Sequence, residues 1–217
     1  MTINTEDLLN SILESLDRIE YIKAEDIPDI DLYMDQVTTF MDTHLKNSSR
    51  NPSEDKILTK TMINNYAKND LIPPPVRKKY SKEHVLLLIF IYYYKGILSI
   101  SDIQELLAPI TRQFFDTAEQ FDLSAVYEEV FGLEREQAAS LKTDVIEKFK
   151  VAGQTFQEAP QESKEFLQMF SFICMLSFDV YVKKLLIEKM IDGIAKGKEK
   201  SERRRAKKQD TSNQYEA

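Results

Sequence analysis

The chain has little of the residues from which most chemical sites are built. Its 217 residues include one cysteine, two histidines, five glycines and no tryptophan. A single cysteine, Cys174, excludes an internal disulfide framework, which suits a reducing compartment. The first residues are acidic where a secretory signal would be basic. We therefore expect a cytoplasmic protein.

The scarcity of histidine and cysteine also argues against a metal centre. His44, His84 and Cys174 lie far apart in the sequence, whereas metal sites need clustered ligands. We expect His84 to pack against or cap a helix, and Cys174 to lie in an inert core. No glycine-rich phosphate loop occurs, and neither histidine has the context of a nucleophile–base pair. We predict no metal, no cofactor and no enzymatic activity.

Long apolar runs are also missing. The two longest, Val85–Leu98 and Phe166–Val182, are interrupted by polar residues and fall short of a bilayer span, which needs about 20 mostly apolar residues. We expect both to form buried core helices in a protein that is not in the membrane.

What the chain does have favours helices. It is 42% hydrophobic and 30% charged, a composition typical of a helical globular protein. Its charge is strongly segregated: residues 1–55 hold thirteen acids against four bases, and residues 101–180 hold fifteen against six. Residues 59–82, by contrast, hold six Lys or Arg against one acid, and residues 183–208 hold eleven bases against four acids. The two basic segments are the parts suited to a polyanion.

Apolar periodicity and capping residues predict an all-α fold with a small β wing. The expected helices cover residues 5–20, 31–45, 58–69, 82–96, 100–107, 111–120, 124–131, 134–151 and 161–195, with a loop over 46–55. Ser99 and Asp102 form a capping box, and Pro109, Gly132 and Gly153 are expected breaks. We expect four parts: an N-terminal helix packed on the body (1–29), a winged helix-turn-helix (30–108), a helical bundle for dimerisation or effector binding (109–195), and a basic, disordered tail (196–217).

The basic segment has the arrangement of a DNA-binding unit. One face of the expected 58–69 helix is apolar, and the opposite face carries polar and basic side chains: Lys60, Thr61, Asn64, Asn65 and Lys68. Asparagine can form a bidentate pair with adenine in the major groove, and lysine can contact flanking phosphates. The prolines at 73–75 end the helix and extend the chain. They lead to a basic loop that holds Arg77, Lys78 and Lys79.

The order of these residues resembles the MerR family of winged-helix regulators. The resemblance rests on residues 59–75, on the wing ending Lys78-Lys79-Tyr80-Ser81, and on Leu98–Leu107. The chain is also similar to an uncharacterised bacterial family of domains of unknown function (number 1836), through Lys78–His84 and Ser99–Ile103. The MerR resemblance implies that helix 59–69 reads a major groove and that the 76–80 wing grips phosphates. The chain departs from MerR by carrying Asn64 and Asn65 where that family has Arg and Tyr, and Asp70 where it has Gly.

The leading hypothesis is therefore a DNA-binding transcriptional regulator that acts on double-stranded DNA. A homodimer is expected, so that two heads can meet two half-sites. The alternative is a protein–protein interaction module that keeps the winged-helix shape without binding DNA, which the acidic flanks favour. An enzyme is a third and weaker hypothesis.

The aromatic and methionine residues of 92–94 and 166–178 leave several interpretations open. Packing in a helical core is the simplest, a small-molecule pocket is an alternative, and the breadth of the 166–178 stripe also fits a subunit interface. The basic residues of 196–208 could add phosphate contacts or act only as a solubilising tail.

Overall fold

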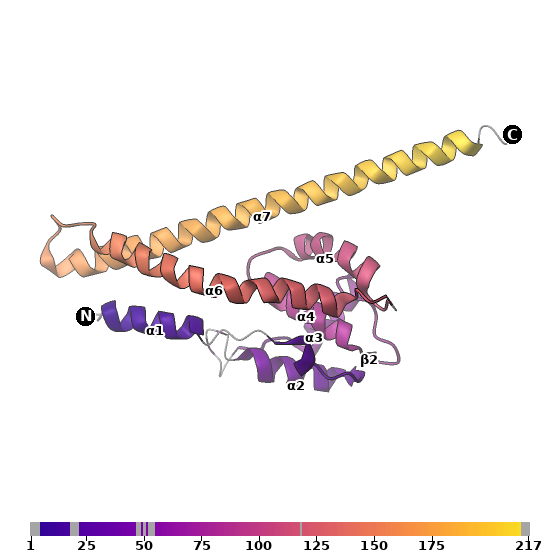
Figure 1. Ribbon diagram of the computed structural model, residues 1–217, viewed down its shortest axis with the longest axis horizontal. Helices are drawn as coiled ribbons and strands as arrows, with labels where there is room; N and C mark the ends of the chain where they lie inside the picture. Colours follow the sequence, from indigo (N-terminus) through magenta and orange to yellow (C-terminus); the bar gives the residue numbers. More distant parts are fainter. Residues whose placement is uncertain are drawn as a thin grey trace.

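The computed structural model describes residues 5–17, 22–46, 49, 51, 55–117 and 119–213. Its elements, in chain order, are α1 Thr5–Asp17, the 3-10 turn η1 Ala24–Asp26, β1 Leu32–Tyr33, α2 Met34–Leu45, α3 Lys60–Lys68, β2 Lys79–Tyr80, α4 Lys82–Tyr94, α5 Ile100–Phe114, α6 Leu123–Gly153 and α7 Gln161–Asn213. The molecule is elongated (Figure 1). A head holds α2 to α5, and a long hairpin of α6 and α7 extends from it. The predicted mostly helical fold with a small β element is confirmed.

Helix α4 lies at the centre of the head. Every residue from Val85 to Ile91 is buried, so this helix is apolar on all sides and must be enclosed by other elements. Those elements are α2, α3, α5, the first turns of α6 and one residue of α7, through Val37, Met41, Leu45, Ile63, Tyr66, Ile103, Leu107, Leu123, Tyr127, Phe131 and Ile191. The prediction that this apolar run forms a core helix is confirmed.

The small sheet joins the start of α2 to the short β-hairpin at Val76–Lys79, which precedes α4. Strands β1 and β2 are antiparallel, with Leu32 opposite Tyr80 and Tyr33 opposite Lys79. The expected helix over 31–45 therefore starts later, at Met34, because the chain first forms this strand. Burial of both Leu32 and Tyr80 holds the pairing in register.

His84 connects the first turn of α4 to the segment before it, which confirms its predicted capping role. Its Nδ1 accepts a hydrogen bond from the backbone N–H of Ser81 at 3.0 Å, and its Nε2 lies 3.2 Å from the carbonyl oxygen of Pro73. Since Nδ1 is the acceptor, the ring is neutral and Nε2 donates to Pro73. The side chain is only 3% exposed and contacts the rings of Tyr80 and Phe115 edge-on.

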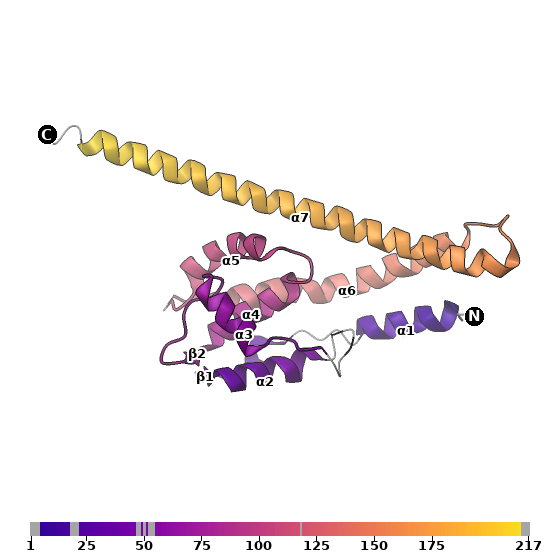
Figure 2. The same ribbon diagram turned by 180° about the vertical axis from the view of Figure 1, so that it is seen from behind.

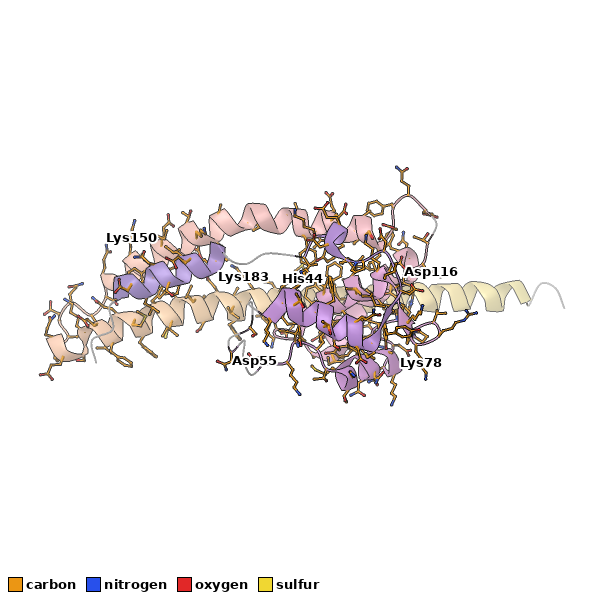
Figure 3. The ribbon with its side chains drawn as sticks, turned by 90° about the horizontal axis from the view of Figure 1, so that it is seen from below. His44, Asp55, Lys78, Asp116, Lys150 and Lys183 are labelled. Carbon is orange, nitrogen blue, oxygen red and sulfur yellow. The ribbon has the colours of Figure 1, made fainter. Side chains whose placement is uncertain are left out.

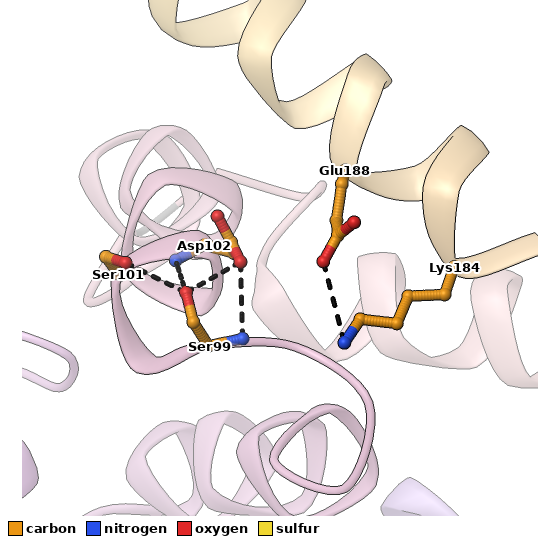
Figure 4. A network of polar contacts seen from close by, with 5 residues as sticks. All are labelled: Ser99, Ser101, Asp102, Lys184 and Glu188. Carbon is orange, nitrogen blue, oxygen red and sulfur yellow. Dashed lines mark hydrogen bonds and ion pairs between the residues drawn. The ribbon is translucent and has the colours of Figure 1, made fainter. Parts of the chain in front are cut away.

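Of the three helix breaks expected from the sequence, at Pro109, Gly132 and Gly153, only the last is found. The predicted capping box forms, since Ser99 accepts from the N–H of Asp102 at 3.1 Å and Asp102 accepts from the N–H of Ser99 at 3.2 Å (Figure 4). Helix α5, however, continues through the exposed Pro109 to Phe114, although proline inside a helix removes one backbone hydrogen bond and crowds the carbonyl four residues earlier. Helix α6 likewise passes through Gly132, and of the three only Gly153 ends a helix.

A second core lies at the end of the α6–α7 hairpin that is far from the head, where α1 packs beside α6 and α7 (Figure 2). Its buried centre is Val145, Ala152 and Phe172, with Leu9, Ile12, Leu13, Phe149, Met169, Met175 and Leu176 around it. Lys148 of α6 ties the two long helices together by pairing with Asp144 and, at 2.8 Å, with Asp179 of α7. The expectation that Cys174 lies in a core is wrong, because its side chain is exposed on the opposite side of α7.

The C-terminal segment also differs from expectation. We predicted disorder from residue 196, but α7 continues as one helix to Asn213 and extends past the head (Figure 1). Lys, Arg, Glu and Ala are strong helix formers, so a segment with no apolar face can still propagate an existing helix. Residues 18–20 of the expected first helix, most of the 46–55 loop and residues 214–217 lie outside the described residues.

None of the described helices has both the length and the apolarity that crossing a membrane requires.

Gly132 offers a test of the continuous α6. A Cβ added there would meet nothing within 4 Å. Glycine in the middle of a helix costs about 0.5–1 kcal/mol relative to alanine, so Gly132→Ala should raise the free energy of unfolding in urea by about that amount. A loss of stability would show that the helix is interrupted at this residue.

His84 should make the stability of the head depend on pH. Burial lowers the pKa of its imidazole below the ordinary 6.5, an effect larger than the opposing pull of the Pro73 and Pro74 carbonyls and of Asp31 and Asp116. Below pH 6.5 the unfolded chain gains a proton that the folded chain does not, so stability should fall as the solution is acidified.

The matched variant is His84→Asn, which can still accept from the N–H of Ser81 but does not titrate. The melting temperature of the native protein should fall more steeply than that of the variant between about pH 7 and about pH 5. Parallel curves for the two proteins would exclude His84 as the source of the pH dependence.

Candidate nucleic-acid interface

Helix α3 is capped at both ends by local interactions. Thr59 is its N-cap, and its hydroxyl accepts from the N–H of Met62 at 3.2 Å. At the other end Asp70 adopts a left-handed φ of 56°, and the N–H of Leu71 bonds to the carbonyl of Tyr66 at 2.9 Å. This is a Schellman C-cap, usually formed with glycine. Asp70, which stands where the MerR family has Gly, thus adopts the left-handed conformation that this cap requires.

The two faces of α3 are sharply different. Ile63 and Tyr66 are buried against the core around α4, and burial raises the pKa of the Tyr66 hydroxyl. The other face points to solvent. All five residues predicted to enter a groove are exposed: Lys60, Thr61, Asn64, Asn65 and Lys68.

After the prolines the chain makes a tight hairpin. Val76 and Lys79 form a β-bridge, and the N–H of Lys79 bonds to the carbonyl of Val76 at 2.9 Å. The two residues between them, Arg77 and Lys78, both have positive φ, 50° and 64°. Positive φ at both central residues marks a type I′ turn, for which Asn-Gly is the preferred sequence.

Two long basic residues are therefore held in a conformation that suits glycine. Each left-handed non-glycine residue costs on the order of 1 kcal/mol or more. Backbone strain of this kind is concentrated at functional sites. The side chains of Arg77 and Lys78 are both exposed, and Lys78 lies at the edge of the head, at the opposite end of the molecule from Lys150 (Figure 3).

The hairpin and α3 meet at the first turn of α2. The ammonium group of Lys79 lies 5.3 Å from the centre of the Tyr33 ring, a cation–π contact. Two residues later, Asp35 forms an ion pair with Lys60 at the start of α3. The two groups of residues predicted from the sequence thus flank one short segment, although seventeen or more positions separate Lys60 from the hairpin.

Tyr33 and Asp35 are contacts that sequence analysis missed. Their alternation with buried Leu32 is too short to indicate a strand, and only the paired sheet brings them beside the basic residues. At the other end of α3, Gln104 of α5 donates to the carbonyl of Asn69 at 3.0 Å and fixes where the helix ends.

Nearby carboxylates reduce the positive charge of this surface. Asp35 pairs with Lys60, and Asp29 pairs with Lys82 at 2.9 Å. The Lys60–Asp35 pair is largely exposed, and such pairs contribute only about 0–1 kcal/mol. A phosphate could therefore take the place of Asp35 at small cost. Lys68, Arg77 and Lys78 form no ion pair within the described part of the chain.

Lys95 holds the segment that leads into α3. Its ammonium group donates to the carbonyl of Ile57 at 2.5 Å and lies 5.0 Å from the centre of the Tyr92 ring. Burial lowers the pKa of Lys95 below its ordinary value. This lysine acts on the interface only through the backbone ahead of Thr59.

No group of three His, Cys, Asp or Glu residues that could hold a metal ion occurs among the described residues. Tyr93 lies among the aromatic rings of the head and contacts Phe131 at 5.8 Å between centres.

Comparison with known proteins gives one family. A model for the domain of unknown function DUF1836 matches residues 22–130. No curated protein and no solved structure matches the chain. The matched segment covers nearly the same range as the core around α4, whose buried residues run from Ile22 to Phe131 and are joined, among the described residues, only by Ile191 of α7. Since the match spans half of the chain and contains the whole of α3, the hairpin and α4, the chain belongs to the DUF1836 family.

Proposed function

We propose that this protein is a DNA-binding transcriptional regulator of MerR-like winged-helix type. The observation that carries the proposal is the meeting of α3 and the basic hairpin at the first turn of α2, with the outer side chains of both exposed. The order of parts, a helix, a second helix, a hairpin paired with a preceding strand and a third helix, supports the winged-helix assignment.

In this proposal α3 enters the major groove, which is about 12 Å wide and admits one helix. Asn64 and Asn65 face the base edges, where an amide can accept from and donate to adenine. Lys60 and Lys68 lie near the two ends of the helix and contact phosphates on either side. Arg77 and Lys78 bind the neighbouring backbone and make the affinity dependent on salt.

The strained turn adds an argument from energetics. If the hairpin only connected β2 to the chain before it, Asn-Gly would give the same turn with less strain. Basic side chains at both strained positions indicate that the side chains themselves are needed there, outside the folded core.

A second candidate is a protein–protein interaction module with the same shape. The observation that favours it is the ion pair of Lys60 with Asp35, together with that of Lys82 with Asp29. In this case the carboxylates neutralise the surface, and the exposed amides of Asn64 and Asn65 bind a polar protein surface. Direct measurement of DNA binding distinguishes the two candidates.

Replacing Arg77, Lys78 and Lys79 together by alanine should weaken binding of sheared genomic DNA. The slope of log affinity against log salt concentration should fall by about 1–3, since each lost phosphate contact removes about 0.9 from it. Fluorescence anisotropy over a series of salt concentrations measures both quantities.

The matched control replaces Lys150, Lys183 and Lys189 by alanine, which removes the same charge from exposed positions on α6 and α7. It should leave the slope nearly unchanged. Equal effects of the two triple variants would show that binding depends on net charge and not on the hairpin. If the native protein does not bind DNA, the interaction module is favoured.

Replacing Arg77→Asn with Lys78→Gly should separate stability from binding. The type I′ turn keeps its shape and loses its strain, so the free energy of unfolding should rise by about 1 kcal/mol. DNA affinity should fall, because both charges are removed. Urea denaturation and anisotropy on the same preparation measure the two effects.

The control for this variant exchanges the residues, Arg77→Lys with Lys78→Arg, which keeps both charge and strain. It should resemble the native protein in both measurements. A stabilised Asn-Gly variant that binds DNA with native affinity would remove the hairpin from the mechanism.

A further inference from the structure

Helix α7 has two apolar sides, and only one of them is covered. Toward α6 and α1 it buries Phe172 and packs Met169, Met175 and Leu176. Near the head it contributes Ile191 to the core around α4. Between residues 166 and 181 the sides of α7 that face away from this core carry six apolar residues that are each more than half exposed: Phe166, Phe170, Ile173, Phe178, Val180 and Tyr181. We call these six residues the outer face of α7.

No described element covers the outer face, since all six of its residues are more than half exposed. Figures 1 and 2 show the later part of α7 along the upper boundary above the head, and its first turns beside α6. Exposed Cys174 lies near the middle of its length. The nearby charged residue Asp179 is engaged by Lys148, so it does not interrupt the apolar surface.

The size of the outer face exceeds what a monomer normally exposes. Aromatic side chains have about 150–250 Å² to bury, so at exposures of 52–67% the four aromatic and two aliphatic residues together present roughly 650 Å². The largest apolar patch on a typical monomer is about 300–600 Å². A standard protein–protein interface buries about 800 Å² from each partner. The outer face therefore supplies most of the area that one half of a stable dimer buries.

The spacing of residues on the outer face indicates that the partner bound there is another helix with the same spacing. Phe166, Phe170, Ile173, Ser177 and Val180 follow one another at intervals of four and three residues. That 3.5-residue period is the seam along which two helices pack as a coiled coil. Within the seam the small Ser177 offers space for a bulky side chain of a facing helix, such as Phe166 or Phe170.

We infer that the outer face of α7 binds the outer face of a second copy of this chain. The contact is isologous, since one seam, apolar except at Ser177, faces itself across a two-fold axis. When the two helices run antiparallel, the two-fold axis passes the middle of the 166–181 segment, where Cys174 lies, and the two Cys174 side chains come close together. The inference concerns α7 and does not depend on DNA binding by α3.

The first test is the mass of the native protein in solution. Analytical ultracentrifugation should give twice the chain mass of 25.3 kDa at moderate concentration. The variant Phe170→Glu with Ile173→Glu places charges on exposed positions of the seam, so it should fold and sediment as a monomer. The control is Ile30→Glu, since Ile30, like Phe170 and Ile173, is more than half exposed but lies in the head. It should remain a dimer.

A second measurement uses the single cysteine. A short bis-maleimide should link Cys174 of two native chains at protein concentrations where random collision gives no product. The link should be absent in Cys174→Ser and in the Phe170→Glu with Ile173→Glu variant.

A native protein that is monomeric at every concentration would overturn the inference, as would a dimer that survives both glutamates. A protein that dimerises through α7 but does not bind DNA would confirm the inference and remove the proposed function. The two failures are therefore distinguishable.

Discussion

A helix that is apolar on every side, such as α4, can exist in water only if other elements enclose it completely. Each of its buried aliphatic residues contributes about 1.5–3 kcal/mol when it leaves solvent, and that gain is lost wherever a neighbour is missing. Enclosure of α4 places α3 with Ile63 and Tyr66 inward, and it draws in the first turns of α6. The position of every other part of the head follows from this requirement.

The surface that we assign to DNA is a result of the same requirement. Because α3 uses one face to cover α4, its amides and lysines must face outward. His84 and the β1–β2 pairing fix the hairpin beside α2, and the tightness of that connection forces Arg77 and Lys78 into the left-handed region. The folding free energy of the head thus offsets the backbone strain at Arg77 and Lys78, which an isolated hairpin would relieve.

Local signals were enough to predict much of the fold. The capping box at Ser99 and the burial of the Val85–Ile91 run depend on neighbours in the sequence, and the exposure of the α3 residues followed from helical periodicity. Tertiary contacts account for what was missed. Strand β1 exists only because Tyr80 lies opposite Leu32, and α6 continues through Gly132 because both cores hold it on either side. The Lys60–Asp35 pair is a long-range contact that no local pattern indicates. DNA binding, the MerR-like assignment and the dimer stay predictions.

One uninterrupted helix, α6, belongs to both cores. Its 31 residues span roughly 46 Å at the α-helical rise, with Tyr127 in the head and Val145 at the far end. A shared rod of this kind transmits tilt, and it couples the folding free energies of the two regions. Any event that strengthens the packing of α1 on α6 and α7 therefore changes the stability of the head. By the same thermodynamic linkage, a ligand that binds the head changes the stability of the packing of α1.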